Sequence, residues 1–113
     1  SKLFIDTGII TIAAFISPTD EIRKQAEEII GKDDFYEIYV STPLTECEKR
    51  DVKGLYAKAR SGEINNFTGI SSPYEPPKNP ALSLDTSVLS VEESMEKLLA
   101  FIQPIIKNKN KEL

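Results

Sequence analysis

An almost unbroken run of apolar, mostly β-branched residues at positions 9–16 constrains the fold of this chain more than any other feature. Such a run is typical of a strand covered on both faces inside a parallel sheet. Two further strands are expected at 35–40, where side chains alternate, and at 81–85. Three strands make a thin sheet, and the first would ordinarily have neighbours on both sides. The pattern therefore predicts that something is missing from the sheet on the N-terminal side.

Helical segments alternate with these strands. The sequence predicts helices over 20–30 and about 43–50. A last helix is expected to begin at Ser90, because Ser90 and Glu93 have the spacing of a capping box. Strands that alternate with helices indicate an α/β sandwich with a parallel sheet.

The two ends of the chain carry their own predictions. Residues 2–7 are interpreted as the end of a helix stopped by Gly8, and no initiator methionine precedes them. The chain is therefore expected to start within something larger. Near the other end, Pro104 is expected to kink or end the last helix, and the lysine-rich tail 107–111 to be disordered.

Composition excludes several classes of function. The 113 residues make one domain at most, and a net charge of −4 argues against a nucleic-acid or membrane surface. The absence of histidine excludes Ser-His and Cys-His catalysis and histidine-ligated metals, and Cys47 alone cannot form an internal disulfide. No apolar run approaches the roughly 20 residues that span a bilayer. A cytoplasmic setting is expected.

A glycine-containing basic segment at 53–64 stands out in this acidic chain. Its cations suit a mobile flap over a nucleotide, although a solvated helix face is the simpler explanation of such a charge cluster. Phe67 follows among turn-forming residues. It either packs its loop onto the core or stacks on a ligand, and the residues alone leave both interpretations open.

Ser17 lies where the first predicted strand meets the following helix. Ligands of open α/β sheets bind at the carboxyl ends of strands, and a helix N-terminus there attracts anions. Ser17 also suits a helix N-cap, with Pro18 at the first helical position, and the two roles can coexist. Thr42 before Pro43 repeats the pattern and is interpreted as architectural.

Several runs of the sequence, in order, resemble the adenylylsulfate (APS) kinase family. They are Phe15-Ile16-Ser17-Pro18, Pro43-Leu44, Cys47-Glu48, Arg50-Asp51, Lys53-Gly54-Leu55-Tyr56, Ala59-Arg60, Gly62-Glu63-Ile64, Phe67-Thr68-Gly69-Ile70 and Pro73-Tyr74-Glu75. The match continues through Leu84 and Thr86 to the final helix, so it covers almost the whole chain. The block from Lys53 to Ile70 is its most specific part.

The resemblance implies a P-loop kinase fold, an α/β three-layer sandwich with a parallel sheet that here lacks its N-terminal P-loop half. Residues 1–113 would be the C-terminal portion of a single APS kinase domain, with a lid at about 53–64 and a substrate loop at about 65–80. The implied reaction transfers the ATP γ-phosphoryl group to the 3′-hydroxyl of adenosine 5′-phosphosulfate. Its product, 3′-phosphoadenosine 5′-phosphosulfate, is the activated sulfate of sulfate assimilation.

The resemblance also assigns roles by position. The residues implied in APS binding are Ile16, Ser17, Lys53, Asn66 and Phe67, with Phe67 stacked on adenine. The residues implied at the ATP adenine are Arg50, Thr86 and Leu89, and the lid cations are Lys58 and Arg60. Bacterial members of the family commonly carry a phosphoserine intermediate at the position of Ser17, although direct in-line transfer needs no covalent enzyme species.

Three departures from the family pattern qualify the resemblance. Thr19 stands where an aromatic residue is usual and Asp20 where Arg is frequent, although Arg23 fits. No Gly-x-x-x-x-Gly-Lys-[Ser/Thr] motif occurs, so nothing here wraps the ATP phosphates. The ligands of the Mg²⁺ that accompanies ATP are therefore expected in the N-terminal half, and none in this chain.

The leading hypothesis is an adenylylsulfate kinase that is inactive as this chain alone. Its expected partners are ATP, APS, a second copy in a homodimer and the N-terminal half of the domain, with no nucleic acid and no membrane. The alternative is a non-catalytic APS-binding or regulatory module. A kinase for another small metabolite is disfavoured, because such kinases have no reason to keep the sequence from Phe67 to Ile70.

Overall fold

The computed structural model describes residues 1–111, which belong to two compact units. The first unit combines Ser1–Tyr36 with Asp51–Asn79, and the second combines Glu37–Arg50 with the residues from Pro80 onward. Each unit is described separately below. None of the helices within residues 1–111 combines the length and the apolar content needed to cross a bilayer.

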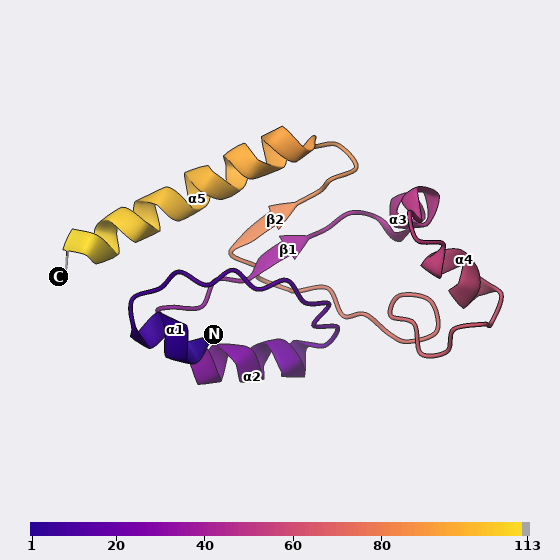
Figure 1. Ribbon diagram of the computed structural model, residues 1–113, viewed down its shortest axis with the longest axis horizontal. Coiled ribbons are helices and arrows are strands. Elements are labelled where there is room, and N and C mark those ends of the chain that lie inside the picture. Colours follow the sequence, from indigo (N-terminus) through magenta and orange to yellow (C-terminus); the bar gives the residue numbers. More distant parts are fainter. Residues whose placement is uncertain (112–113) are drawn as a thin grey trace. The chain divides into compact units, whose positions relative to one another are not determined.

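The second unit contains the sheet. Strands β1 (Ile38–Val40) and β2 (Leu82–Leu84) lie side by side and pair in parallel, with Ile38 opposite Leu82 (Figure 1). Leu84 is buried, at 6% exposure. The parallel pairing confirms the strands predicted at 35–40 and 81–85, although each is only three residues long. The α/β class is therefore confirmed.

The strand predicted at 9–16 is wrong. Residues 9–18 form no helix or strand, and no backbone hydrogen bond joins residues 10–16 to the other described residues. Ile12 and Phe15 are each 82% exposed. A strand exists only through pairing with a neighbour, and within residues 1–111 the sheet consists of β1 and β2 alone. The apolar run is present, but no strand pairs with it.

Two helices of the first unit begin and end close to the predicted positions. Helix α1 (Lys2–Asp6) is followed by Gly8 at φ +83°, and helix α2 (Asp20–Ile30) confirms the prediction of 20–30. The N-cap of α2 is Thr19, whose hydroxyl accepts the Ile22 N–H. Ser17 as N-cap is therefore wrong, because an N-cap needs extended backbone and Ser17 lies at φ +43°.

Helices α3 (Leu44–Arg50) and α4 (Leu55–Arg60) are short, whereas α5 (Val91–Lys111) has 21 residues. The Ser90 N–H donates to the Glu93 carboxylate over 2.7 Å, and the Glu93 N–H donates to the Ser90 hydroxyl over 3.1 Å. These reciprocal bonds confirm the predicted capping box at the start of α5.

The predicted end of this last helix is wrong. Helix α5 continues through Pro104 to Lys111, so Pro104 does not end it and the tail 107–111 is helical. Proline removes one N–H donor, but the turns on both sides keep their own hydrogen bonds. Lys109 and Lys111 lie in the last turn, where the helix dipole favours positive charge.

Acidification should weaken the start of α5. The Ser90 backbone N–H, and after it the Ser90 hydroxyl, hold the pKa of Glu93 below its usual value. Because the folded pKa is the lower one, the stabilisation is present above the unfolded pKa and is lost as pH falls through the folded pKa. We expect the helical NMR shifts of Ser94 and Met95 to decline over that acidic range.

The variant Glu93→Gln is the matched control for this titration. Glutamine keeps an oxygen acceptor for the Ser90 N–H but carries no titrating carboxyl group. The decline should therefore be smaller in the variant. Equal declines in the two proteins would contradict the role given to Glu93.

Candidate functional site

The chain turns sharply at Ser17, between the extended segment and α2. Ser17 has φ +43°, a left-handed conformation that costs a non-glycine residue about 1–3 kcal/mol. Its carbonyl oxygen accepts a hydrogen bond from Arg23 Nη1 at 2.7 Å. Ile16, just before it, is 68% exposed. The surrounding contacts therefore hold Ser17 in a conformation that it would not adopt alone.

Phe67 begins a compact turn of residues 67–72. The N–H groups of Ile70, Ser71 and Ser72 all donate to the Phe67 carbonyl oxygen, over 3.0–3.1 Å. In return, the Phe67 N–H donates to the Ser71 hydroxyl at 2.8 Å. The half-buried Phe67 ring contacts the ring of Tyr56 edge to face, with centroids 5.1 Å apart. The hydrogen bonds to the Phe67 backbone and the ring contact with Tyr56 together hold the aromatic ring in place.

Helix α4 lies at the centre of the predicted lid and is capped by Asp51. The two carboxylate oxygens of Asp51 accept the N–H groups of Tyr56 and Ala57, at 2.9 and 3.0 Å. Gly54 precedes the helix at φ +67°, a conformation that favours glycine, and Ala59 is buried at 7% exposure. The helix is therefore anchored at its first turn and on one face.

The lid cations point to solvent. Lys53 precedes α4, while Lys58 and Arg60 lie in its last turn, and all three residues are exposed. Positive charges at a helix C-terminus are favoured by the helix dipole. Three exposed cations therefore lie on one short, anchored helix or just before its N-cap, Gly54.

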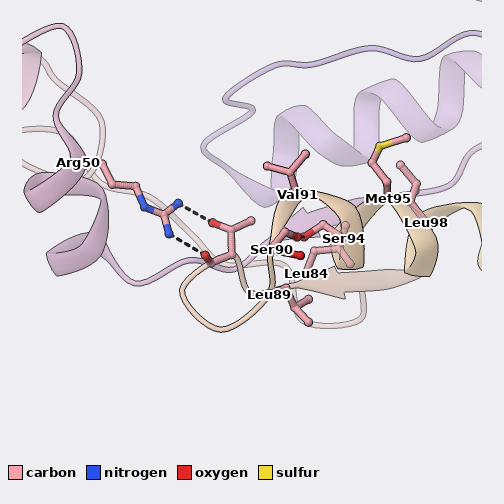
Figure 2. Close-up of a pocket in the computed structure, with 9 residues that line it drawn as sticks. Arg50, Leu84, Leu89, Ser90, Val91, Ser94, Met95 and Leu98 are labelled. Atoms are coloured by element: carbon pink, nitrogen blue, oxygen red, sulfur yellow. Dashed lines mark hydrogen bonds between the residues drawn. The ribbon is translucent and has the colours of Figure 1, made fainter.

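In the second unit, Arg50 and Thr86 are joined directly. Arg50 Nη1 donates to the Thr86 hydroxyl at 2.9 Å and Nη2 donates to the Thr86 carbonyl oxygen at 2.6 Å (Figure 2). The hydroxyls of Thr42 and Thr86 share a hydrogen bond, and the Thr86 N–H donates to the Thr42 hydroxyl. Thr42 is architectural, as expected, but it joins the two strand ends instead of capping α3.

A cavity of about 480 Å³ lies beside this cluster. Val91, Met95 and Leu98, which follow one another along one side of α5 in Figure 2, are among the residues that line it. The full lining comprises Arg50, Leu84, Thr86, Leu89, Ser90, Val91, Ser94, Met95 and Leu98. Its walls are mostly apolar, with the guanidinium at one side, which suits a flat heteroaromatic ring better than a phosphate group.

Asp85 adds a negative charge next to Thr86. The Ser87 hydroxyl and then the Ser87 N–H donate to its carboxylate, at 2.6 and 2.8 Å, and lower the pKa of Asp85. The nearby Arg50 charge lowers it further. Asp85 is therefore held in its ionised form. No group of three or more carboxylate or cysteine side chains within residues 1–111 could hold a metal ion.

The structure brings some of the predicted site residues together and leaves others apart. Arg50, Thr86 and Leu89 line one cavity. By contrast, no hydrogen bond, ion pair or ring contact among the described residues directly joins the members of the APS set, which are Ile16, Ser17, Lys53, Asn66 and Phe67. Asn66, like Ser17, has a positive φ (+56°).

Sequence reasoning gave no role to Arg23, Asp51, Tyr56 or Glu75, which shape these segments. Signals for two of them were present in the sequence. Asp20 and Arg23 have the i, i+3 spacing of a helical ion pair, and Asp51 precedes a helix that has no capping side chain at Gly54. The hydrogen-bond partners of Glu75 are Pro18, Asp20 and Arg23, all at least 52 residues away in sequence, so no local pattern indicates them.

Comparison with known proteins identifies the family. Residues 1–85 match the protein family described as adenylylsulphate kinase. The adenylyl-sulfate kinase of Bacteroides fragilis (strain ATCC 25285) is 74% identical over 104 residues, covering 92% of this chain and 52% of that protein. The adenylyl-sulfate kinase of Phocaeicola vulgatus is 69% identical over 112 residues, covering 99% of this chain and 55% of that protein.

A solved structure agrees with these relatives. The APS kinase CysC of Mycobacterium tuberculosis, in complex with AMPPNP and APS, matches with a TM-score of 0.83 and 44% identity. The match covers 89% of this chain and 59% of that chain. The chain therefore belongs to the adenylylsulphate kinase family, which confirms the resemblance seen in its residues. It spans about half the length of the curated relatives it matches.

Removing the Asp51 cap should loosen the start of α4. In the variant Asp51→Ala, the N–H groups of Tyr56 and Ala57 lose their acceptors, and a lost cap typically costs about 1 kcal/mol. Their amide hydrogen exchange should become roughly fivefold faster. The matched control is Glu21→Gln, an exposed carboxylate on α2, which should leave these two amides unchanged. Unaltered exchange in Asp51→Ala would contradict the capping role.

Proposed function

We propose that this chain forms the C-terminal part of an adenylylsulfate kinase domain, which transfers the ATP γ-phosphoryl group to the 3′-hydroxyl of APS. The observation that carries this proposal is the family match over residues 1–85, which contain every predicted APS-binding residue. The relative from Mycobacterium tuberculosis, solved with AMPPNP and APS, supports the same pair of ligands. The transfer reaction would also require the P-loop half of the domain, whose motif this sequence lacks.

On the APS side, we propose that Phe67 stacks on the adenine ring. Its ring is held by Tyr56 and its backbone by the 67–72 turn, so little freedom is lost when a ligand binds. Stacking of a base on an aromatic ring contributes about 1–3 kcal/mol. Asn66 precedes it in a left-handed conformation, and Lys53 is exposed and free to approach a phosphosulfate.

Ile16 and Ser17 would line the same APS site. The bend at Ser17 places a hydroxyl-bearing residue after the exposed apolar segment. In the direct mechanism, positioning and charge stabilisation supply the catalysis, and no phosphoserine is required. Lys58 and Arg60 on the lid would close over the phosphates, exclude water and stabilise their charge.

On the ATP side, we propose that the cavity beside α5 accepts the adenine. Leu89 and the apolar residues of α5 would face the ring, while Arg50 is held in place by Thr86. The ligands of the Mg²⁺ that accompanies ATP would come from the P-loop half. A homodimer and a cytoplasmic setting remain predictions for the whole kinase.

A hybrid kinase tests the proposal, with this chain replacing the matching part of the Bacteroides fragilis relative. The hybrid should be active, while the chain alone should turn over no ATP. In the hybrid, Lys53→Ala should raise the KM for APS by about tenfold, the effect of one lost charge-assisted hydrogen bond, without changing the KM for ATP. Steady-state kinetics with each substrate varied in turn measures both constants.

The matched control is Lys32→Ala, which removes another exposed lysine of the first unit and should leave both KM values unchanged. Full activity of the chain alone would contradict the proposal. An inactive hybrid that still binds APS in calorimetry would favour the alternative, a non-catalytic APS-binding module.

The ATP side has its own test in the same hybrid. Thr86→Val removes the hydroxyl that accepts from the Arg50 guanidinium and should raise the KM for ATP by about tenfold, since a hydrogen bond from a charged donor contributes roughly 1.5 kcal/mol or more. The KM for APS should stay the same. Ser87→Ala serves as the control, because Ser87 does not line the cavity. Unchanged ATP kinetics in Thr86→Val would show that Thr86 has no role in the ATP site.

A further inference from the structure

Arg23 is the charged side chain that is buried among the described residues, at 8% exposure. Its guanidinium contacts both the bend at Ser17 and the loop that follows Phe67. Nη1 donates to the Ser17 carbonyl oxygen at 2.7 Å, and Nη2 donates to the Glu75 carbonyl oxygen, also at 2.7 Å. Nη2 also forms an ion pair with the Asp20 carboxylate. One side chain therefore joins the bend at Ser17 to a loop residue 52 positions beyond Arg23.

Hydrogen bonds that do not involve Arg23 join the same two segments. The Glu75 N–H donates to the Pro18 carbonyl oxygen at 2.8 Å, and the Asp20 N–H donates to the Glu75 carboxylate at 2.9 Å. The guanidinium thus lies within a small network of backbone contacts. Only a planar group with several fixed donors can serve these acceptors together, so lysine is not equivalent here.

The segment between Glu75 and Phe67 is stiff. Pro73 restricts its own backbone, and the turn 67–72 is closed by three hydrogen bonds to the Phe67 carbonyl oxygen. A displacement of Glu75 would therefore move the turn that carries the aromatic ring. On the other side, the left-handed conformation of Ser17 relies on the hydrogen bond from Arg23.

We infer that Arg23 is a positioning residue for APS, because it clamps the Ser17 bend to the Phe67-to-Glu75 loop. This inference rests on the proposed function, since it takes both segments to face APS. Asp20 pairs with Arg23 and neutralises its charge locally, so the charge of Arg23 is used inside the network. Arg23 itself does not touch the substrate.

The test uses the hybrid kinase with the variants Arg23→Met and Arg23→Lys. Both should raise the KM for APS by roughly tenfold, comparable to one lost charge-assisted hydrogen bond, and leave the KM for ATP unchanged. Lysine should not rescue, because it cannot reach all the acceptors. A merely structural role would lower the amount of active enzyme, and hence kcat, with both KM values unaltered.

The matched control is Lys24→Met, which removes the neighbouring exposed cation of α2 and should change neither KM. The inference is overturned if both Arg23 variants keep the original KM for APS, if Arg23→Lys restores it, or if the two KM values rise together.

Amide hydrogen exchange in the same hybrid separates this inference from the proposed function. In Arg23→Met, the amides of Asp20, Glu75 and Ser72 should exchange about tenfold faster than in the unsubstituted hybrid. An inactive hybrid that shows this change would refute the proposed function while confirming the clamp. Equal exchange in the two proteins would overturn the clamp, whatever the activity.

Discussion

The backbone of residues 10–16 makes no hydrogen bond to the rest of the described chain. This lack of pairing limits both the sheet and the core among the described residues. Backbone N–H and C=O groups are almost always paired in folded proteins, and apolar side chains are normally covered. Here the segment meets neither condition, since Ile9, Ile12 and Phe15 are all more than half exposed. Among the described residues, the buried apolar side chains are Ala59 and Leu84. A two-stranded parallel sheet and two buried side chains do not make an ordinary core.

This constraint agrees with the length comparison. The chain spans about half of its curated relatives. In the account proposed here, the other half supplies a strand beside residues 9–16, the phosphate-binding loop and the Mg²⁺ ligands. In the same proposal, this chain would supply the surfaces that recognise the two nucleotides. Such a division would explain how the 67–72 turn and helix α4 can be well formed in the first unit while the apolar segment of that unit remains uncovered.

Local signals in the sequence predicted local structure well. The extent of α2, the capping box of Ser90 and Glu93 and the strands after Phe35 and Pro80 all follow from neighbours within a few residues. Whether residues 9–16 form a strand could not be predicted in the same way, because pairing requires a partner elsewhere. Their apolar pattern shows only that they are suited to burial.

The site, like the fold, was predictable only where its signals lie close together in the sequence. The family resemblance named Ser17, Lys53 and Phe67, but a one-dimensional pattern gives neither the left-handed backbone of Ser17 nor the contacts of Arg23 with Glu75. Such contacts depend on how the loop after Phe67 folds back onto α2. Helix α5 continues past Pro104, because a long helix tolerates one missing N–H donor that the local sequence alone suggests would end it.

The most direct measurement of the central claim is amide hydrogen exchange of residues 10–16, followed by mass spectrometry in the chain alone and in the hybrid kinase. If this segment is a strand that pairs with the other half, its exchange should be rapid in the chain alone. In the hybrid it should be slower by roughly two orders of magnitude or more. Equally rapid exchange in both proteins would contradict the account, because residues 9–16 would then pair with nothing in the complete kinase domain.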